Sequence, residues 1–189
     1  MKKNLLILII IFSILAIDLP FMLAYESSLV TLHFTDAEQT NTLNYLQNKE
    51  PLLVDYTEDE ISHLEDVKKL MHFANNYFVF VLVIEIFLLV IIYQIDKKQF
   101  YKPFLYGGII STAVLLLTLF WALLDFSSLF NLFHQIFFPQ GNWQFPDTGK
   151  LVNLFTASFF YQITKEIFIK SLMSSIIFIG LGLYLREKW

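Results

Sequence analysis

Four long apolar stretches constrain the fold of this chain more than any other feature of its sequence. They cover about residues 4–23, 74–95, 103–124 and 167–185. Each has close to the ~20 apolar residues that an α-helix needs to cross a bilayer. With 56% hydrophobic and 16% charged residues among 189, the chain has too little polar surface to cover a water-soluble globule. The sequence therefore predicts an all-α membrane protein with four transmembrane helices, in a single membrane domain over residues 1–189.

Short charged segments predict how the spans are oriented. Basic residues flank the spans at three places: Lys2 and Lys3, the segment 96–102, and Arg186 with Lys188. Basic residues in short loops stay in the cytoplasm. We therefore expect cytoplasmic N- and C-termini, and outer loops over residues 24–73 and 125–166, in the bacterial cell membrane. On this topology all four histidines lie on the outer side: His33, His63, His72 and His134.

The first span has some features of a cleaved signal peptide. It has a basic start and an apolar centre, and it ends near Ala24, a conceivable cleavage point. We expect a retained anchor instead, because the apolar run is long for a signal and Met22 fits poorly two residues before the cut. Both interpretations keep the same orientation.

The composition excludes several classes of function. The chain has no cysteine, which rules out disulfides, thiolate metal sites and a cysteine nucleophile. The net charge is −4 and no Lys/Arg cluster is interleaved with aromatic residues, so we expect no nucleic-acid partner. The sequence has no HExxH motif or comparable compact histidine pair. We therefore expect no metal and no cofactor.

The first outer loop contains a predicted amphipathic helix over residues 57–72. Thr57 and Glu60 have the spacing of a capping box, in which each side chain bonds the backbone N–H of the other residue. His63 lies at the edge of the apolar face, with Glu60 and Asp66 three residues to either side. We expect one of these carboxylates to bond a ring nitrogen, which makes the other nitrogen a better base. The plainer interpretation is a solvated histidine, and we apply it to His33 and His72. The apolar face comprises Ile61, Leu64, Val67, Leu70 and Met71.

The second outer loop, which begins at Asp125, is too apolar and aromatic for a water-exposed segment. Phenylalanines spaced along one helical face predict an interfacial helix that contains His134 and ends before Pro139. Gly141, Asn142 and Trp143 follow the turn. A histidine in such apolar surroundings suits a catalytic base, whereas the simpler interpretation is a set of membrane-interface anchors. The phenylalanines are Phe126, Phe130, Phe133 and Phe137.

Both loops resemble a bacterial membrane family, the lipoprotein intramolecular transacylases, formerly known only as a domain of unknown function. Residues 56–67, YTEDEISHLEDV, resemble that family's E-x-x-H-x-x-D-V element. Residues 129–145, LFNLFHQIFFPQGNWQF, resemble its Phe-rich histidine and Gly-x-Trp element. The resemblance extends over essentially the whole chain, although Thr156 stands where we would expect proline.

The resemblance implies an intramolecular acyltransferase with a two-histidine acid/base site. A fatty acyl chain would move from the sn-2 ester of a diacylglyceryl-cysteine lipoprotein to the α-amine of that cysteine, giving an N-acyl, S-monoacylglyceryl lipoprotein. The implied partners are diacylglyceryl-modified lipoproteins and membrane lipids. By the motif match, His63 and His134 are the catalytic pair. The residues expected to bind substrate or support the pair are Glu60, Asp66, Asp125, Gly141, Asn142 and Trp143.

This chemistry suits the residues because the substrate's own amine attacks its own ester, so no nucleophilic side chain is needed. An imidazole with a pKa near ~6.5 can take a proton from an α-amino group that titrates near ~8. A second imidazole can protonate the departing alkoxide, and the Gly141 N–H, Asn142 or the Trp143 indole can donate to the oxyanion. The sequence leaves open which histidine is the base, which is the acid, and whether one transiently carries the acyl group.

Two other functions are compatible with the sequence. A metal-dependent membrane lipid hydrolase would use His63, His134, Glu60 and Asp66 as ligands. A non-enzymatic membrane subunit would dock a partner through the Phe-rich surface. Glu85, near the middle of the second span, has either a functional or a structural role, and we do not place it in the site. In a structural role it would be protonated and bonded to a hydroxyl such as that of Ser111 or Thr112.

Overall fold

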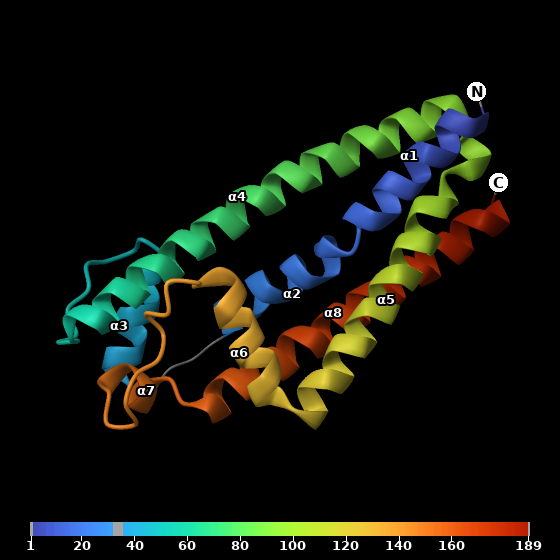
Figure 1. Cartoon of the computed structure of the whole chain (residues 1–189). Helices are drawn as coiled ribbons and strands as arrows, with labels where there is room; N and C mark the ends of the chain where they lie inside the picture. The colour runs from blue at the N-terminus through green and yellow to red at the C-terminus, as the bar shows by residue number, and fades with distance from the viewer. Residues whose placement is uncertain (1, 32–35, 189) are drawn as a thin grey trace. The chain divides into compact units, whose positions relative to one another are not determined.

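The structure is a computed structural model that describes residues 2–31 and 36–188, with the side chains of residues 2 and 29–31 excepted (Figure 1). All regular secondary structure in these ranges is helical, as predicted. His33 lies outside the described residues. The chain divides into two compact units. The span unit comprises Met1–Val30, Tyr77–Phe120 and Lys165–Trp189, and the histidine unit comprises Thr31–Asn76 and Trp121–Thr164.

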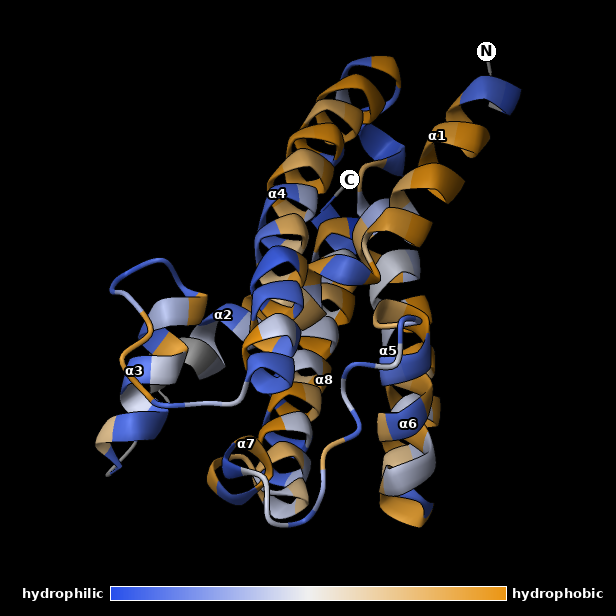
Figure 2. Ribbon diagram, turned by 60° about the vertical axis from the view of Figure 1, so that its left-hand side comes forward, coloured by the Kyte–Doolittle hydropathy of each residue, from blue (hydrophilic) through white to orange (hydrophobic). Residues whose placement is uncertain are grey.

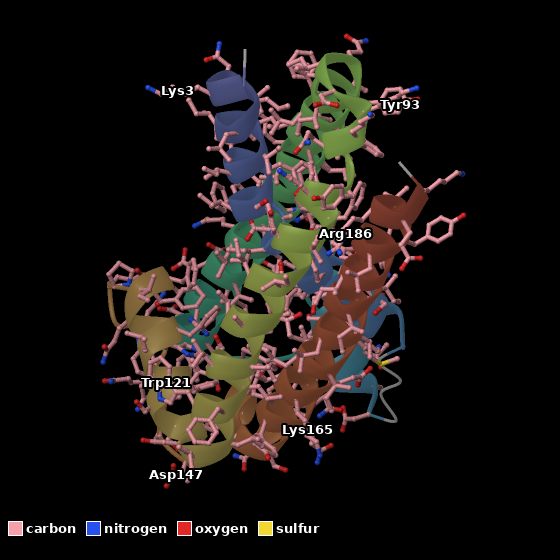
Figure 3. The ribbon with its side chains drawn as sticks, turned by 90° about the vertical axis from the view of Figure 1, so that its right-hand side faces the viewer. Lys3, Tyr93, Trp121, Asp147, Lys165 and Arg186 are labelled. Carbon is pink, nitrogen blue, oxygen red and sulfur yellow. The ribbon has the colours of Figure 1, made fainter. Side chains whose placement is uncertain are left out.

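Four helical stretches within the described residues are long and apolar enough to cross a membrane, which confirms the predicted number of spans. Figure 2 shows hydrophobic residues around the C-terminal half of α4 and hydrophilic ones in its first turns. Lys3 on α1 and Tyr93 near the end of α4 lie at the same end of the span unit (Figure 3). The four stretches are Lys3–Ser28 (α1 and α2), Glu58–Ile95 (α4), Lys97–Leu124 (η1, Lys97–Gln99, and α5, Tyr101–Leu124) and Ala157–Lys188 (α8).

The first span differs from the single helix expected over residues 4–23, because it consists of two helices. Helix α1 covers Lys2–Leu15 and α2 covers Asp18–Thr31. Pro20 has no N–H, so it cannot bond the carbonyl four residues earlier, at Ala16. The Ser111 hydroxyl donates to that Ala16 carbonyl at 2.9 Å. A side chain of α5 therefore satisfies the backbone group that the proline leaves open, as the interior of a bilayer requires.

Small residues let the helices of the span unit approach closely. A Cβ added at Gly182 in α8 would lie 2.6 Å from the backbone nitrogen of Leu105 in α5. One added at Gly108 in α5 would lie 2.9 Å from the Ser175 carbonyl oxygen. A Cβ added at Gly180, two residues from Gly182, would have no neighbour within 4 Å. The contact between α5 and α8 therefore depends on the absence of side chains at particular positions.

Glu85 is buried in the span unit, and neither of its carboxylate oxygens has a hydrogen-bond partner among the described residues. The two hydroxyls considered as partners are engaged elsewhere. Ser111 bonds the Ala16 carbonyl, and Thr112 bonds the Ser175 hydroxyl at 2.9 Å. The expected bond between Glu85 and one of these hydroxyls is therefore wrong.

Helix α4 joins two elements that the sequence predicts separately, the amphipathic helix 57–72 and the span 74–95. It runs without a break from Glu58 to Ile95 because no glycine or proline interrupts it. Its 38 residues rise ~57 Å, whereas a bilayer core is ~30 Å thick. The membrane-spanning part of α4 begins at about residue 74. The first four turns of the helix precede this part and belong to the histidine unit.

The histidine unit has its own small core, built from helices α3, α4 and α7 (Lys150–Leu154) and the segment before α4. Helix α3 (Ala37–Leu46) begins at Asp36, whose side chain accepts the N–H groups of Glu38 and Gln39. The Tyr56 hydroxyl bonds the Thr42 hydroxyl at 2.8 Å inside the unit. The buried members of this core are Val54, Tyr56, Leu64 and Leu151.

The segment predicted as the second outer loop folds into helices α6 (Phe126–Phe137) and α7 (Lys150–Leu154), followed by the start of α8. Helix α6 ends before Pro139, which confirms the predicted helix. Phe133, Ile136 and Phe137 are exposed on one side of it. Thr156 starts α8, because its hydroxyl accepts the Phe159 N–H at 3.3 Å. The residue that departs from the family pattern therefore caps a helix.

Candidate functional site

Glu60 fixes the start of α4 and ties it to α7. Its Oε2 accepts the Thr57 N–H at 2.9 Å, and the Thr57 hydroxyl accepts the Glu60 N–H at 3.3 Å. These two bonds confirm the predicted capping box. Its Oε1 accepts the Leu151 N–H, in the first turn of α7, at 2.7 Å. Burial alone would raise the pKa of Glu60, but the bonds from Leu151 and Thr57 outweigh it and hold the pKa below its ordinary value. Glu60 is therefore a buried carboxylate that holds two helix starts together.

His63 lies one turn further along α4 and is 7% exposed. Aromatic rings enclose it: the Phe138 ring centroid is 4.8 Å away and the Phe145 ring centroid 5.6 Å away, both edge-on. Its ring atom Nδ1 is buried and has no hydrogen-bond partner among the described residues. The predicted edge position on the helix is thus covered by the loop that follows α6.

His134 lies on α6 and is 8% exposed. Its Nδ1 lies 2.8 Å from the carbonyl oxygen of Phe130. Because a carbonyl can only accept, Nδ1 carries the hydrogen and Nε2 keeps a free lone pair. The rings of Phe130 and Trp143 lie 4.1 Å and 4.9 Å from the His134 ring, centroid to centroid. His134 is therefore fixed in the tautomer of a base, with an apolar surrounding.

The two histidines, which are far apart in the sequence, form a stacked pair inside the histidine unit. Their ring centroids are 6.0 Å apart and their planes are inclined by 28°. A substrate group that reaches one imidazole is therefore also close to the other. The ring of Phe138, which is 2% exposed, lies within 5.5 Å of both histidine rings, centroid to centroid.

Burial keeps both histidines neutral. Burial, assisted by the neighbouring His134, lowers the pKa of His63 from 6.5 to about 4, against the opposing effects of Asp66 and Asn142. Burial also lowers the pKa of His134, although its bond to the Phe130 carbonyl opposes the shift. At neutral pH both rings can accept a proton, as acid/base chemistry on an amine requires.

The expected bond between His63 and a flanking carboxylate is wrong. Glu60 faces α7, as described above. Asp66 accepts from the side chains of Lys69 at 3.0 Å, Gln140 at 2.8 Å and Asn142 at 2.9 Å. These bonds lower the pKa of Asp66, Lys69 first and Asn142 second, while its partial burial opposes them. Spacing along one helix cannot show that partners from a distant loop compete for a carboxylate.

The turn after α6 brings Asn142 and Trp143 to the histidines. Gly141 has a φ of 81°, a left-handed conformation that glycine adopts without strain. Its N–H bonds the Phe138 carbonyl at 3.1 Å and closes the turn. Asn142 then faces α4, where it bonds Asp66, while Trp143 packs on His134. Three of the predicted supporting residues thus lie together beside the pair.

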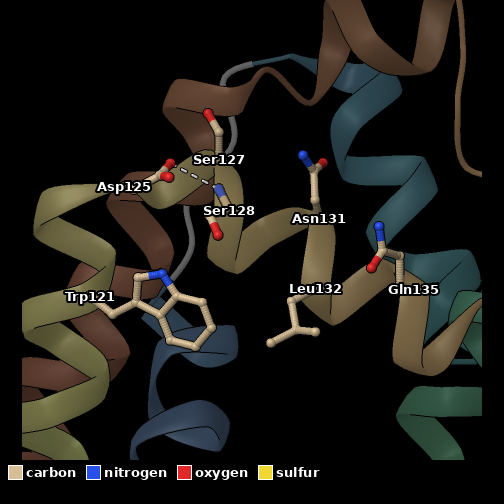
Figure 4. Close-up of a pocket in the computed structure, with 7 residues that line it drawn as sticks. All are labelled: Trp121, Asp125, Ser127, Ser128, Asn131, Leu132 and Gln135. Carbon is tan, nitrogen blue, oxygen red and sulfur yellow. Dashed lines mark hydrogen bonds between the residues drawn. The ribbon is translucent and has the colours of Figure 1, made fainter.

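Asp125 has a different place. Its side chain caps α6 by accepting the Ser128 N–H at 3.0 Å. It lines a pocket of about 530 Å³ with Trp121, Asn131 and Gln135, and neither histidine lines that pocket (Figure 4).

His72, on α4, bonds the Asn48 side chain at 2.6 Å. Within the described residues no group of three or more His, Cys, Asp or Glu side chains is placed to hold a metal ion.

Phe138, Phe145 and Gln140 contact the site but do not figure in the sequence analysis as site residues. Phe138 falls just after the helical phenylalanine pattern, so periodicity alone does not select it. Phe145 and Gln140 lie in irregular backbone, where no repeat predicts the direction of a side chain. The signal that was available is their closeness in sequence to Gly141 and Trp143.

The fold and the site together define an all-helical, multi-pass membrane protein with a buried, aromatic-lined histidine pair. The sequence profile described as "Lipoprotein intramolecular transacylase Lit" matches residues 3–160. This chain therefore belongs to the lipoprotein intramolecular transacylase family, whose name describes an acyltransferase.

Solved structures and a curated relative agree with this membership. The chain resembles the in meso structure of the membrane-integral lipoprotein intramolecular transacylase Lit from Bacillus cereus, with a TM-score of 0.82 at 20% identity, covering 100% of this chain and 98% of the other. A variant of that protein with one histidine replaced by alanine gives a TM-score of 0.79 at 17% identity, covering 99% and 96%. These structures show that the fold is shared. An uncharacterised protein from Aquifex aeolicus (strain VF5) is 24% identical over 128 residues, which cover 68% of this chain and 56% of that protein. The match thus spans little more than half of that relative.

Proposed function

We propose that this chain moves the sn-2 fatty acyl group of a diacylglyceryl-cysteine lipoprotein to the α-amine of the same cysteine. The product is an N-acyl, S-monoacylglyceryl lipoprotein. The observation that carries the proposal is the His63–His134 pair, with ring centroids 6.0 Å apart and both rings buried among aromatic side chains. Two neutral imidazoles close to one another suit this reaction, because they can take the protons that the substrate amine loses and return one of these protons to the departing alkoxide.

The proposed location is the outer face of the bacterial cytoplasmic membrane. The first turns of α4, the acidic loop before them and the exposed apolar side of α6 support it. A helix with such a face lies at the level of the lipid headgroups. The ester and the amine of a membrane-anchored lipoprotein lie at the same level, so the partners we propose are such lipoproteins together with membrane lipids.

The proposed reaction balances without a co-reactant. His63 takes one proton from the substrate ammonium, and the free amine attacks the ester carbonyl to form the C–N bond. His134 takes a second proton from that nitrogen at its Nε2 atom, which the Phe130 bond leaves free. The C–O bond to the glyceryl oxygen breaks, and protonated His63 gives its proton to the departing alkoxide. His134 then releases its proton to water, and both rings are neutral again.

The surroundings of the pair support this chemistry in two ways. The rings of Phe138, Phe145 and Trp143 exclude water, which strengthens each electrostatic interaction in the site. The oxyanion requires fixed donors. We assign this role to the indole N–H of Trp143, whose ring packs against His134. The Gly141 N–H already bonds the Phe138 carbonyl.

Replacing either histidine tests the proposal. We expect His63→Ala and His134→Ala each to lower the rate of acyl transfer at least ~100-fold, the smallest effect usual for loss of a general acid or base. The assay is mass spectrometry of lipoprotein N-termini after incubation of a diacylglyceryl lipoprotein with purified enzyme. The chain offers a matched control in His72→Ala, because His72 lies on the same helix and bonds only Asn48 among the contacts found.

We expect the control to keep wild-type rates. Normal formation of the N-acyl product by either active-site variant would contradict the assignment of that histidine. Normal product formation by both would favour a non-enzymatic role for this chain.

A further inference from the structure

Two buried polar atoms, from neighbouring side chains of the histidine unit, have no hydrogen-bond partner that accounts for them. They are Nδ1 of His63 and Oδ1 of Asn142, and neither has a hydrogen-bond partner among the described residues. The Asn142 side chain lies beside His63, because its Nδ2 atom is 2.9 Å from Oδ2 of Asp66 and 3.4 Å from the hydroxyl oxygen of Ser62, the residue before His63 on α4. A bond from this side chain also raises the pKa of His63. A buried polar atom without a partner costs roughly 1–3 kcal/mol. These two atoms can form a hydrogen bond with one another, provided that one of them carries a hydrogen.

The direction of that bond follows from the groups around it. The Asp66 carboxylate can only accept, so the amide group that faces it at 2.9 Å is the Nδ2 donor of Asn142. The other end of the amide, facing His63, is therefore the Oδ1 acceptor. An acceptor at this place requires a hydrogen on Nδ1 of His63, which leaves the lone pair on Nε2.

We propose that Asn142 is a positioning residue that links the Asp66 carboxylate to Nδ1 of His63, so that His63 presents a free Nε2 to the substrate. The Asp66–Asn142–His63 relay then orients the ring and stabilises its protonated form, as a second partner does for many functional histidines. This inference rests on the proposed function for the role of His63, but the relay itself is a property of the unreacted protein.

The charged and titratable groups that act on His63 come from two helices. Asp66 is on α4 with it, and Lys69 bonds that carboxylate at 3.0 Å. His134 faces it from α6. Asn142 is the polar side chain of the intervening loop that reaches both Asp66 and the ring. The loop also supplies Gln140, which donates to Asp66 at 2.8 Å but is exposed and acts on the carboxylate alone.

This difference between Asn142 and Gln140 provides a matched pair of variants. Histidine tautomers are distinguished by the ¹⁵N chemical shifts of the ring nitrogens, and a His63→Gln variant assigns the His63 signals among the four histidines. In the detergent-solubilised wild type and in the Gln140→Leu variant, we expect the His63 tautomer that carries its hydrogen on Nδ1. In Asn142→Leu we expect loss of that tautomer and a lower pKa of His63, with the His134 signals unchanged. Asn142→Asp, which keeps an acceptor at this place, should retain the tautomer.

The NMR result is independent of activity, so the relay and the proposed function can fail separately. An unchanged His63 tautomer and titration in Asn142→Leu would overturn the relay, as would loss of the tautomer in Gln140→Leu. If the NMR spectra show the relay in the wild type, we expect Asn142→Leu to lower kcat ~10- to 100-fold with little change in KM, the usual effect of losing such a partner. We expect Asn142→Asp to recover part of the lost kcat. A relay confirmed by NMR without any acyl transfer in the wild type would refute the proposed function and leave the relay standing.

Discussion

Burial decides the charge of the individual histidines, and this makes the stability of the chain depend on pH. The pKa of His63 falls from 6.5 in the unfolded chain to about 4 in the folded one, through burial and the proximity of His134. Between these values the unfolded chain binds a proton that the folded chain does not. The stability that comes from the neutral ring is therefore complete above pH 6.5 and is lost as the pH falls towards 4.

We expect the melting temperature in detergent to fall as the pH is lowered from 6.5 to 4, and to fall less in His63→Gln. The difference corresponds to at most on the order of 3 kcal/mol, because one pKa unit is worth about 1.4 kcal/mol. Thermal unfolding followed by tryptophan fluorescence over this pH range measures it. Equal pH dependence of the two proteins would show that folding does not lower the pKa of His63.

Residue-scale inference from the sequence succeeds where a short pattern determines the contact. Thr57 and Glu60 form the predicted capping box because both partners lie within one helical turn. The bond expected between Asp66 and His63 fails because Asn142, distant in sequence, takes that carboxylate. The catalytic roles of His63 and His134 remain predictions that rest on the family motifs.

At the scale of helices, Glu60 does more than a capping residue normally does. One carboxylate oxygen serves the start of α4 and the other serves the start of α7. The buried carboxylate has no cation as partner in these contacts, so backbone N–H groups and the Thr57 hydroxyl stabilise its charge. The positive ends of two helix dipoles face the same side chain, which favours the anion further.

We expect Glu60→Gln to lower the free energy of unfolding by about 1–3 kcal/mol, since a charge-assisted bond at one of the two helix starts is lost or weakened. Glu58→Gln is the matched control, because Glu58 is an exposed acidic residue in the same first turn. Thermal unfolding of the three proteins at one neutral pH makes the comparison. A loss as large in Glu58→Gln would point to a general effect of charge instead of the contact with α7.

The sequence predicts long helices better than it predicts their junctions. The spans and α6 follow from composition and periodicity, and the structure contains them. The break after Leu15 depends on Pro20 and on a hydroxyl from α5, which no local pattern shows. Helix α3 escapes prediction because its polar sequence has no apolar stripe, and its N-cap, Asp36, is the one signal for it.

At the scale of the whole molecule, the residues of the proposed chemistry all belong to the histidine unit, whereas the four apolar stretches contribute most of the span unit. The expected single domain and the expected orientation of the termini both remain predictions. The orientation matters for function because we propose that the substrate reacts at the outer face of the membrane. The arrangement of basic residues favours that orientation through the positive-inside rule.

Labelling of introduced cysteines tests the orientation, and the natural chain provides a background free of cysteine. Asp147, in the segment between the third and fourth spans, and Lys98, in the segment between the second and third spans, are both exposed. We expect a membrane-impermeant maleimide to label Asp147→Cys in intact cells and to label Lys98→Cys only after the membrane is permeabilised. The reverse pattern would place the histidine pair on the cytoplasmic side, where the proposed reaction would need a different supply of lipoprotein substrate.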